Sequence, residues 1–460
     1  MTETAIPSHP QASVRLSHLA AALMCVAILL APALWNGYPL LQYDTGGYLA
    51  RWYEGYLVPS RSTVFGLYLH LGEGWRFWPE LVFQAACTVW VIRLVLRVFG
   101  FDATPWPLIT VIAGLSILTA LPVLSSTLLT DIFVGLAVLA LHLLIFHRED
   151  LRPAERVGLF GLIAFAAATH SATLAVLLAI LIFSVPLLLW SNARVLFRLL
   201  PAAGAIVAGA AMLLAANFAF SGQLAWTPGG FGIAFGRMLQ DGIVKRYLDD
   251  HCPDARLKLC PYRKQLPQNA DEFLWSYGIF NDLGRFDGLG EEMRHIVLHS
   301  AAAYPLQQAA AALAATATQL HLVETGHGTH DRIWHTYGII KRFIPGEVPA
   351  MQKARQQRGE LSFELLNRVH WPIALGSMAL VLALLVNALV CGRFDASIRL
   401  AGTVAVALLA NAFVCGALSG PHDRYGARIV WIATFVAAIE ALQAVRSLVA
   451  ERKARNAVAP

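Results

Sequence analysis

The sequence predicts an all-α polytopic membrane protein. Of its 460 residues, 57% are hydrophobic and only 14% are charged, whereas soluble proteins carry about 25% charged residues. The mean hydropathy is +0.57, and apolar stretches long enough to cross a bilayer recur along the chain. These observations exclude an ordinary soluble enzyme, a disordered chain and a fibrous chain.

Membrane-spanning helices need about 20 mostly apolar residues, and we expect about ten of them. One apolar stretch, 157–190, is too long for a single helix, so we expect a tight turn within it at Thr169-His170-Ser171. The expected spans are 17–35, 79–99, 105–123, 127–146, 157–169, 172–190, 199–219, 371–391, 398–418 and 427–446.

The expected spans divide the chain into three regions. Residues 1–219 hold spans one to seven and a loop at 36–78, residues 220–370 form an extramembrane segment, and residues 371–460 hold the last three spans and a tail. The Ala-rich stretch 296–320 contains Gln and His, which favours an amphipathic helix on the membrane surface. An additional span at this stretch is the alternative.

The placement of arginine gives the orientation. Residues such as Arg93, Arg97, Arg152 and Arg198 gather in loops on the same side as both termini, and the opposite short loops hold fewer. Because positive residues favour the cytoplasmic side, we expect both termini to be cytoplasmic. The loop after span one and the segment before span eight then face outward. The net charge of +6 reflects this topology and does not indicate nucleic acid binding.

Two of the six cysteines, Cys252 and Cys260, lie in the outward-facing segment with seven residues between them. An oxidising compartment favours a disulfide between them. The alternatives are two free thiols or a loose metal-binding pair. The remaining cysteines lie in expected spans, where a thiol behaves as a small apolar group.

Polar residues in loop 36–78 are candidates for chemistry. Asp44, preceded by Tyr43, follows the first span closely, and a carboxylate there can accept a proton from a hydroxyl nucleophile. A solvated loop residue or a helix cap is the alternative interpretation. Glu54 is the next acid in the loop. Arg61 lies at a membrane surface, where it suits a phosphate, although an arginine that extends to lipid headgroups is the simpler interpretation.

Further polar residues lie at the outward ends of later spans. Asp131 lies about one turn inside the fourth span, where an ionisable side chain needs a partner or a wet cavity. His170, in the next outward turn, is placed to reach the same cavity, or is structural. The short turn before the last span holds His422, Asp423, Arg424 and Tyr425, which suit a phosphate clamp or an interface anchor.

A histidine-rich stretch at 321–335 includes His327 and His330 near carboxylates. We expect a loop over the cavity whose histidines contact substrate, with metal binding as the alternative. The sequence contains no phosphate-binding loop, dinucleotide fingerprint, kinase motif set or nucleophile elbow. The cytoplasmic loops are too short for a nucleotide-binding domain, which argues against ATP-driven transport by this chain.

The order of these motifs resembles the GT-C superfamily of polyprenyl-phosphate-dependent integral membrane glycosyltransferases. The resemblance rests on Tyr43-Asp44-Thr45 after the first span, Pro59-Ser60-Arg61, the stretch from Ser126 to Asp131, the polar turn at His170, and Arg424-Tyr425 before the final span. Many relatives have two adjacent acids in the first loop, whereas Asp44 is followed by Thr45 here.

The resemblance implies a function and a set of roles. A sugar would pass from a polyprenyl-phosphate donor to an acceptor hydroxyl of a glycan, lipid or protein. Asp44 would be the catalytic base or a metal contact, and Asp131, the second catalytic candidate, would orient groups inside the cavity. Arg61, Arg424 and Tyr425 would bind the donor phosphate. The resemblance leaves open a divalent metal, Mg²⁺ or Mn²⁺.

The same resemblance implies an integral protein of a bacterial inner membrane, in contact with membrane lipids, with its site on the extracytoplasmic face. The alternatives are a transporter or flippase of lipid-linked glycans, another membrane acyl- or phospho-group transferase, and a non-catalytic assembly factor. Transporters place ionisable residues near the bilayer midplane and are often built from repeated halves, and neither feature is evident in this sequence.

Overall fold

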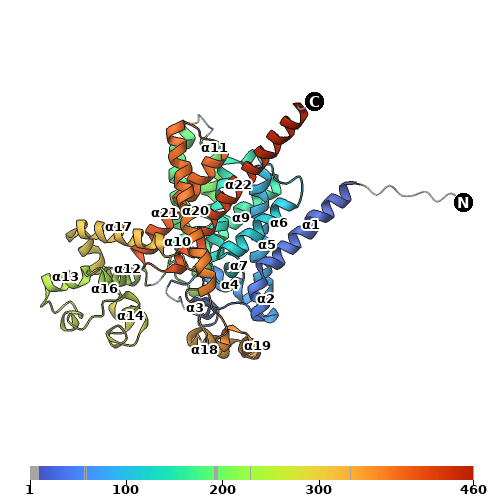
Figure 1. Cartoon of the computed structure of the whole chain (residues 1–460). Coiled ribbons are helices and arrows are strands. Elements are labelled where there is room, and N and C mark those ends of the chain that lie inside the picture. The colour runs from blue at the N-terminus through green and yellow to red at the C-terminus, as the bar shows by residue number, and fades with distance from the viewer. Residues whose placement is uncertain are drawn as a thin grey trace.

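The structure is a computed structural model that describes residues 10–55, 57, 60–190, 195–227, 229–331 and 333–458. Pro59, which belongs to one of the motifs above, lies outside the described residues. The described chain is helical, and the β pairing within it is an isolated parallel bridge between Leu40 and Thr127. The predicted all-α class is therefore confirmed (Figure 1).

The first half of the chain contains α1 (Pro10–Leu29), α2 (Ala31–Asn36), α3 (Tyr43–Tyr53), α4 (Thr63–Leu71), α5 (Trp78–Val98), α6 (Trp106–Leu118), α7 (Leu121–Ser125), α8 (Asp131–Phe146), α9 (Pro153–Thr169), α10 (Ser171–Trp190) and α11 (Val195–Ser221). The second half contains α12 (Gly230–Gln240), α13 (Ile243–His251), α14 (Ala270–Trp275), α15 (Ile279–Asp282), α16 (Arg285–Ala303), α17 (Pro305–His321), α18 (Trp334–Phe343), α19 (Val348–Lys353), α20 (Glu364–Cys391), α21 (Ala396–Leu418) and α22 (Asp423–Val458). Short 3-10 helices occur at Glu73–Trp75, Arg148–Asp150, Cys260–Tyr262, Pro345–Glu347 and Gln356–Arg358.

Within the described residues, five helices are long and apolar enough to cross a membrane. They are Trp78–Val98, Phe197–Ser221, Glu364–Cys391, Ala396–Leu418 and Asp423–Asn456. Each predicted span overlaps at least one helix, but the other helices are shorter or fall below these limits, so five of the expected ten or so spans are supported. One reason is that predicted spans are interrupted: α6 ends at Leu118, Thr119 is extended, and α8 begins only at Asp131. The five helices suggest an integral membrane protein.

Helix α8 forms the centre of the bundle. All 16 of its residues are buried, and at 1.5 Å per residue it is about 24 Å long. Its Gly135 permits close contact with α22, because a Cβ there would lie 2.6 Å from the ring of the fully buried Trp431. The bundle perimeter is apolar and exposed, for example at Leu382 and Val386 of α20. An exposed apolar face of this kind is typical of contact with lipid.

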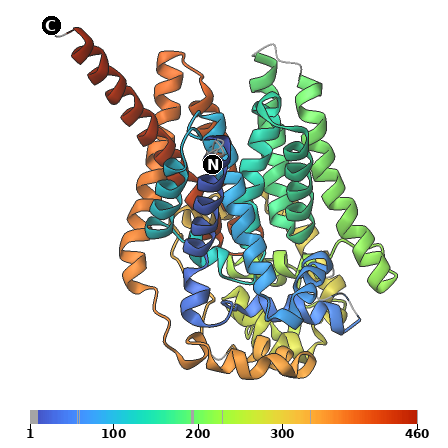
Figure 2. The same cartoon turned by 90° about the vertical axis from the view of Figure 1, so that its right-hand side faces the viewer.

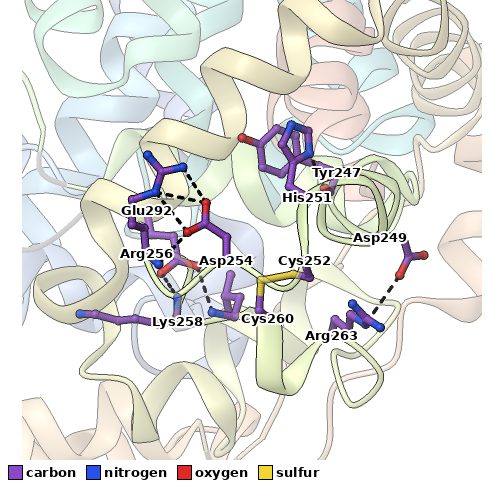
Figure 3. Close-up of a disulfide and its surroundings, with 11 residues drawn as sticks. Tyr247, Asp249, His251, Cys252, Asp254, Arg256, Lys258, Cys260, Arg263 and Glu292 are labelled. Carbon is purple, nitrogen blue, oxygen red and sulfur yellow. Dashed lines mark hydrogen bonds and ion pairs between the residues drawn. A yellow bond between two sulfur atoms is a disulfide. The ribbon is translucent and has the colours of Figure 1, made fainter.

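Helices α12 to α16 form a second unit with its own apolar core, which includes Phe235, Leu248 and Met293. A disulfide joins Cys252 and Cys260 within it, which confirms the predicted pairing (Figure 3). Next to the disulfide, Glu292 of α16 accepts hydrogen bonds from two backbone N–H groups of the loop between the cysteines, those of residues 258 and 259.

The stretch 296–320, predicted as one surface helix, is divided between α16 and α17. The division falls at Tyr304-Pro305, because proline lacks the N–H that would continue the first helix and starts the second one well. Neither helix is among those of membrane length and hydropathy. Helix α17 packs against α21, where a Cβ at Gly416 would lie 2.8 Å from the Ala315 carbonyl oxygen.

The two ends of the bundle differ. The beginning of α1 and the end of α22 lie toward one end, whereas α3, α4, α18 and α19 lie at the other, beside the unit of α12 to α16 (Figures 1 and 2). We call this second end the loop end. It is formed by chain segments that the sequence analysis assigned to loop 36–78 and to the segment 220–370.

Candidate functional site

The segment before α3 is fixed against the segment that leads into α8. Leu40 N donates to the Ser126 carbonyl (2.9 Å), and Leu128 N donates to the Leu40 carbonyl (3.0 Å). Gln42 caps α3 reciprocally with Thr45, whose hydroxyl also donates to the Leu128 carbonyl (3.0 Å). The first turn of α3, which carries Asp44, is thereby held beside the start of α8, which carries Asp131.

Arg61 reaches Asp44 from the segment before α4. Ser62 caps α4 and donates its hydroxyl proton to the Ala168 carbonyl (2.8 Å), which ties this segment to α9. Arg61 Nη2 donates to Asp44 Oδ1, and Arg61 Nη1 donates to the Ser60 carbonyl (3.1 Å). The side chains of Arg61 and Asp44 are 19% and 20% exposed, so this ion pair faces a partly open space.

Arg424, in the first turn of α22, connects two carboxylates. Its Nε donates to Asp131 Oδ2 (2.6 Å) and its Nη1 donates to Asp44 Oδ2 (2.6 Å). Arg428, one turn later, places Nη1 at 3.6 Å from Asp131 Oδ1 and donates from Nη2 to Asn411 Oδ1 (2.7 Å). The side chains of Asp131 and Arg428 are 2% and 1% exposed, so this part of the network is buried.

Asp44, Arg61, Asp131, Arg424 and Arg428 form what we call the ionic cluster. Its three guanidinium groups and two carboxylates leave one positive charge in excess. Burial alone would raise the pKa of the Asp44 carboxyl, but Arg61 and Arg424 outweigh it and hold that pKa well below its usual range. Asp44 is therefore a carboxylate at neutral pH, and the cluster is suited to receive one further anion.

His170 lies in the turn between α9 and α10, as predicted, and belongs to the surroundings of the cluster. Its Nδ1 is buried and has no hydrogen-bond partner in the described part of the chain. Burial, together with the guanidinium group of Arg428, lowers the pKa of His170 to about 3. The imidazole is therefore neutral at physiological pH, so it adds no charge to the cluster and offers a free nitrogen beside it.

A small cavity of about 20 Å³ borders the cluster, which is room for roughly one water molecule. Its polar wall includes Gln42, Asp131, His327 and Arg424, and its apolar wall includes residues of α7 and the segments that flank it. The polar wall is suited to a charged head, and the apolar wall is suited to hydrocarbon. A larger molecule needs the segment that covers the cavity to move.

The covering segment, residues 322–331, lines the cavity at Thr325, Gly326, His327 and Thr329 and is attached at both sides. Gln42 Nε2 donates to the His327 carbonyl (3.1 Å), and the Glu324 backbone N–H donates to Asp423 Oδ1 (2.9 Å). The His327 ring stacks on His422, with ring centroids 5.2 Å apart. His327, His422 and Asp423, which the sequence predicted as cavity residues, therefore lie together at the rim.

Two other predicted residues lie near the same rim. The Tyr43 ring lies 5.9 Å from the ring of His330, which belongs to the covering segment. Tyr425 lies below the guanidinium groups of Arg424 and Arg428, whose central carbons are 5.7 and 5.4 Å from its ring centroid. Tyr425 therefore supports the arginines by cation–π contact.

Glu54 does not join the cluster. It follows the last turn of α3, ten residues after Asp44, which is about 15 Å along a helix. Its nearest charged partner is Arg342, with Nη1 at 4.0 Å. No group of three or more His, Cys, Asp and Glu side chains in the described ranges is arranged to hold a metal ion. Because both carboxylates of the cluster already face guanidinium groups, the cluster as arranged does not fit a divalent metal.

Sequence reasoning missed three residues that hold the site together. Arg428 was not among the predicted site residues, although it follows Arg424 by four residues and so shares its helix face. Gln319 exchanges hydrogen bonds with the backbone of His422 (2.9 Å each), and Gln356 does the same with Leu41 (3.0 and 2.7 Å). The spacing of Arg428 was a usable signal, whereas nothing local marks the two glutamines.

Comparison with protein-family models, with curated proteins and with solved structures finds no match to this chain. The ionic cluster is therefore the feature of the molecule from which a function can be inferred.

Proposed function

We propose that the chain is a membrane glycosyltransferase that moves a sugar from a polyprenyl-phosphate donor to an acceptor hydroxyl on the outer face of the membrane. The observation that carries the proposal is the ionic cluster, in which two carboxylates and three guanidinium groups meet at one end of a bundle of apolar helices. This arrangement combines a proton acceptor with a binding site for phosphate at the height of lipid headgroups.

The excess positive charge supports a lipid-linked donor. Arg61 and Arg424 have partly exposed side chains, at 19% and 13%, and are the groups that a phosphate can reach. Asp131 is buried beneath them and holds Arg424 in position, and the buried Arg428 in turn pairs with Asp131. Once the covering segment moves, the apolar wall of the cavity is suited to the first isoprene units of a donor, whose sugar would then lie toward the covering segment.

Asp44 is the proposed base. Its carboxylate is ionised and lies 2.6 Å from a guanidinium nitrogen of Arg424, so a hydroxyl beside a phosphate bound to Arg424 lies within its reach. His170 interacts with Asp44, His327 lines the cavity, and His422 stacks on His327, and these three histidines are proposed to contact sugar hydroxyls. No step is assigned to a metal ion, because the cluster does not present a free set of ligands.

The full topology belongs to the proposal. With about ten spans and cytoplasmic termini, the loop end faces outward, where no nucleotide-sugar pool exists and a sugar has to arrive on a lipid. The position of the charged residues also argues against a transporter or flippase, because transporters bind substrate near the bilayer midplane. Here the cluster lies at the first turns of α3, α8 and α22.

The test compares surface glycans by mass spectrometry in a deletion strain complemented with variants. Wild type and Asp249→Asn are expected to restore the parental profile, because Asp249 is 53% exposed and lies 3.9 Å from Arg263, away from the cluster. Asp44→Asn is expected to reduce transfer by about 10²–10⁴-fold, the usual effect of losing a general base. A deletion strain with an unchanged glycan profile, or full complementation by Asp44→Asn, contradicts the proposal.

A further inference from the structure

The arrangement around Asp44 poses a chemical problem for a base. Oδ1 accepts from Arg61 and Oδ2 accepts from Arg424, so each carboxylate oxygen is held by a guanidinium group. Charge-assisted hydrogen bonds of this kind stabilise the ionised form and oppose protonation. An Asp44 that stays paired in this way accepts a proton from a hydroxyl poorly.

The two arginines differ in how firmly they are held. Arg424 also binds Asp131, whose side chain is 2% exposed, so it has a second carboxylate that keeps it in place. Arg61 has Asp44 as its carboxylate partner among the described residues, and its other hydrogen bond goes to the Ser60 carbonyl. Of the two, Arg61 is the arginine that can change partner without leaving a buried charge unpaired.

We propose that the phosphate of the donor replaces the Asp44 carboxylate as the partner of Arg61 and thereby frees Asp44 Oδ1 for the acceptor hydroxyl. This inference rests on the proposed glycosyltransferase function. It adds that Asp44 can act as a base only while the donor is bound. The other titratable groups that interact with Asp44 are Arg424, His170, Tyr48 and Tyr425, and none of them is an anion that could take over the role of the phosphate.

The balance of charge supports this exchange. A sugar linked to polyprenyl phosphate is a phosphodiester with one negative charge, which cancels the one positive charge in excess in the cluster. In the reaction the acceptor O–H bond breaks and its proton goes to Asp44. A bond forms from the acceptor oxygen to the anomeric carbon, and the bond from that carbon to the phosphate oxygen breaks.

The leaving polyprenyl phosphate then carries two negative charges, and Asp44 carries none. The three arginines and the one remaining carboxylate of the cluster contribute two positive charges, which match the leaving group. The site is therefore electrically neutral before and after transfer. With two arginines, the product state would carry an uncompensated negative charge.

The experiment measures the protonation of Asp44 directly. The full chain is labelled with ¹³C at the aspartate carboxyl carbons, placed in lipid nanodiscs and titrated by NMR, with Asp44→Asn to assign the signal. Farnesyl phosphate is the probe, farnesol is the control with the same tail and no phosphate, and inorganic phosphate tests a free anion. Farnesyl phosphate is expected to move the Asp44 titration upward by at least one pH unit, and farnesol is expected to leave it unchanged.

The variant Arg61→Gln is expected to raise the Asp44 titration without ligand and to weaken farnesyl phosphate binding at least tenfold. Arg342→Gln is the matched control, since Arg342 is 72% exposed and lies 4.0 Å from Glu54, outside the cluster. Inorganic phosphate is expected to need at least tenfold higher concentrations for the same shift.

The outcomes separate the inference from the proposed function. Farnesyl phosphate that binds while the Asp44 titration stays unchanged or moves downward overturns the exchange and leaves the transferase proposal intact. An affinity for farnesyl phosphate no higher than that for farnesol removes the lipid-phosphate donor, and the exchange is rejected with it. Equal potency of inorganic phosphate and farnesyl phosphate also rejects the lipid-linked form of the exchange.

Discussion

The buried contact between Asp131 and Arg424 is expected to contribute strongly to the stability of the fold. Arg424 Nε lies 2.6 Å from Asp131 Oδ2, and Arg424 Nη2 lies 3.5 Å from Asp131 Oδ1. The arginine therefore donates hydrogen bonds to both carboxylate oxygens. The Asp131 side chain is 2% exposed and that of Arg424 is 13% exposed. The perturbation is a double-mutant cycle of Asp131→Asn, Arg424→Gln and both changes together.

The expected loss in the free energy of unfolding follows from the burial of the Asp131–Arg424 pair. Removing one partner of a buried ion pair costs about 3–5 kcal/mol, because the remaining charge is left uncompensated. Arg428 stays 3.6 Å from Asp131 and compensates part of the loss, so we expect about 3 kcal/mol for Arg424→Gln. The double variant leaves no Asp131 charge unpaired, and we expect it to be at least about 2 kcal/mol more stable than the sum of the single changes.

The assay is reversible unfolding of the full chain in mixed micelles with increasing fractions of a denaturing detergent. The pair Glu364 and Arg368 is the control, because its atoms are 2.8 Å apart but its side chains are 77% and 70% exposed. Exposed pairs couple by about 0.2–1 kcal/mol. A coupling below about 0.5 kcal/mol between Asp131 and Arg424 would refute the view that the cluster is one buried network.

Three further predictions concern other parts of the molecule. Gly426→Ala should destabilise the protein, because the new Cβ would lie 2.0 Å from the Leu322 carbonyl oxygen, and a thermal unfolding scan that matches wild type would contradict this close contact. Cys252 and Cys260 should resist thiol labelling in unreduced, denatured protein, and their reduction should lower stability by roughly 2–3 kcal/mol because the closed loop is short. The free energy of unfolding should fall by at most about 1.4 kcal/mol per pH unit as the pH drops from about 6.5 toward 3, because His170 takes up a proton in the unfolded chain but stays neutral in the folded chain. Unfolding measured against pH should show a shallower loss of stability for His170→Gln than for wild type. An identical slope in the two proteins would count against this assignment.

Local sequence pattern was sufficient for the helices and for the grouping of the candidate residues. Asp131 and Arg424 each lie where an apolar helix begins, and Asp44 lies in the loop that follows the first expected span, so the expected topology places all three at the same end of the bundle. The disulfide between Cys252 and Cys260 could also be predicted from the sequence, because both cysteines lie in one short stretch of the same extramembrane segment.

The remaining features depend on contacts between distant parts of the chain. The two oxygens of Asp44 accept hydrogen bonds from Arg61 and Arg424, which lie 17 and 380 positions away in the sequence. No local sequence pattern encodes these two contacts. Gln356 reaches Leu41 across 315 positions for the same reason. The length of a span is also ambiguous in an apolar sequence, since a single extended residue such as Thr119 ends a helix without changing the hydropathy of the stretch.

The contribution of α22 to the ionic cluster has a consequence for biogenesis. Asp44 and Asp131 belong to the first third of the chain, whereas Arg424 and Arg428 arrive with its last helix. A chain that enters the membrane from its N-terminus therefore carries a carboxylate at the start of α8 for nearly three hundred residues of synthesis before the arginines that neutralise it exist. Until then α8 cannot settle in the centre of the bundle with Asp131 charged, and the loop end stays open to water. The last helix thus closes the protein, and a chain that stops short of it presents an unpaired acid to the insertion and quality-control machinery of the cell.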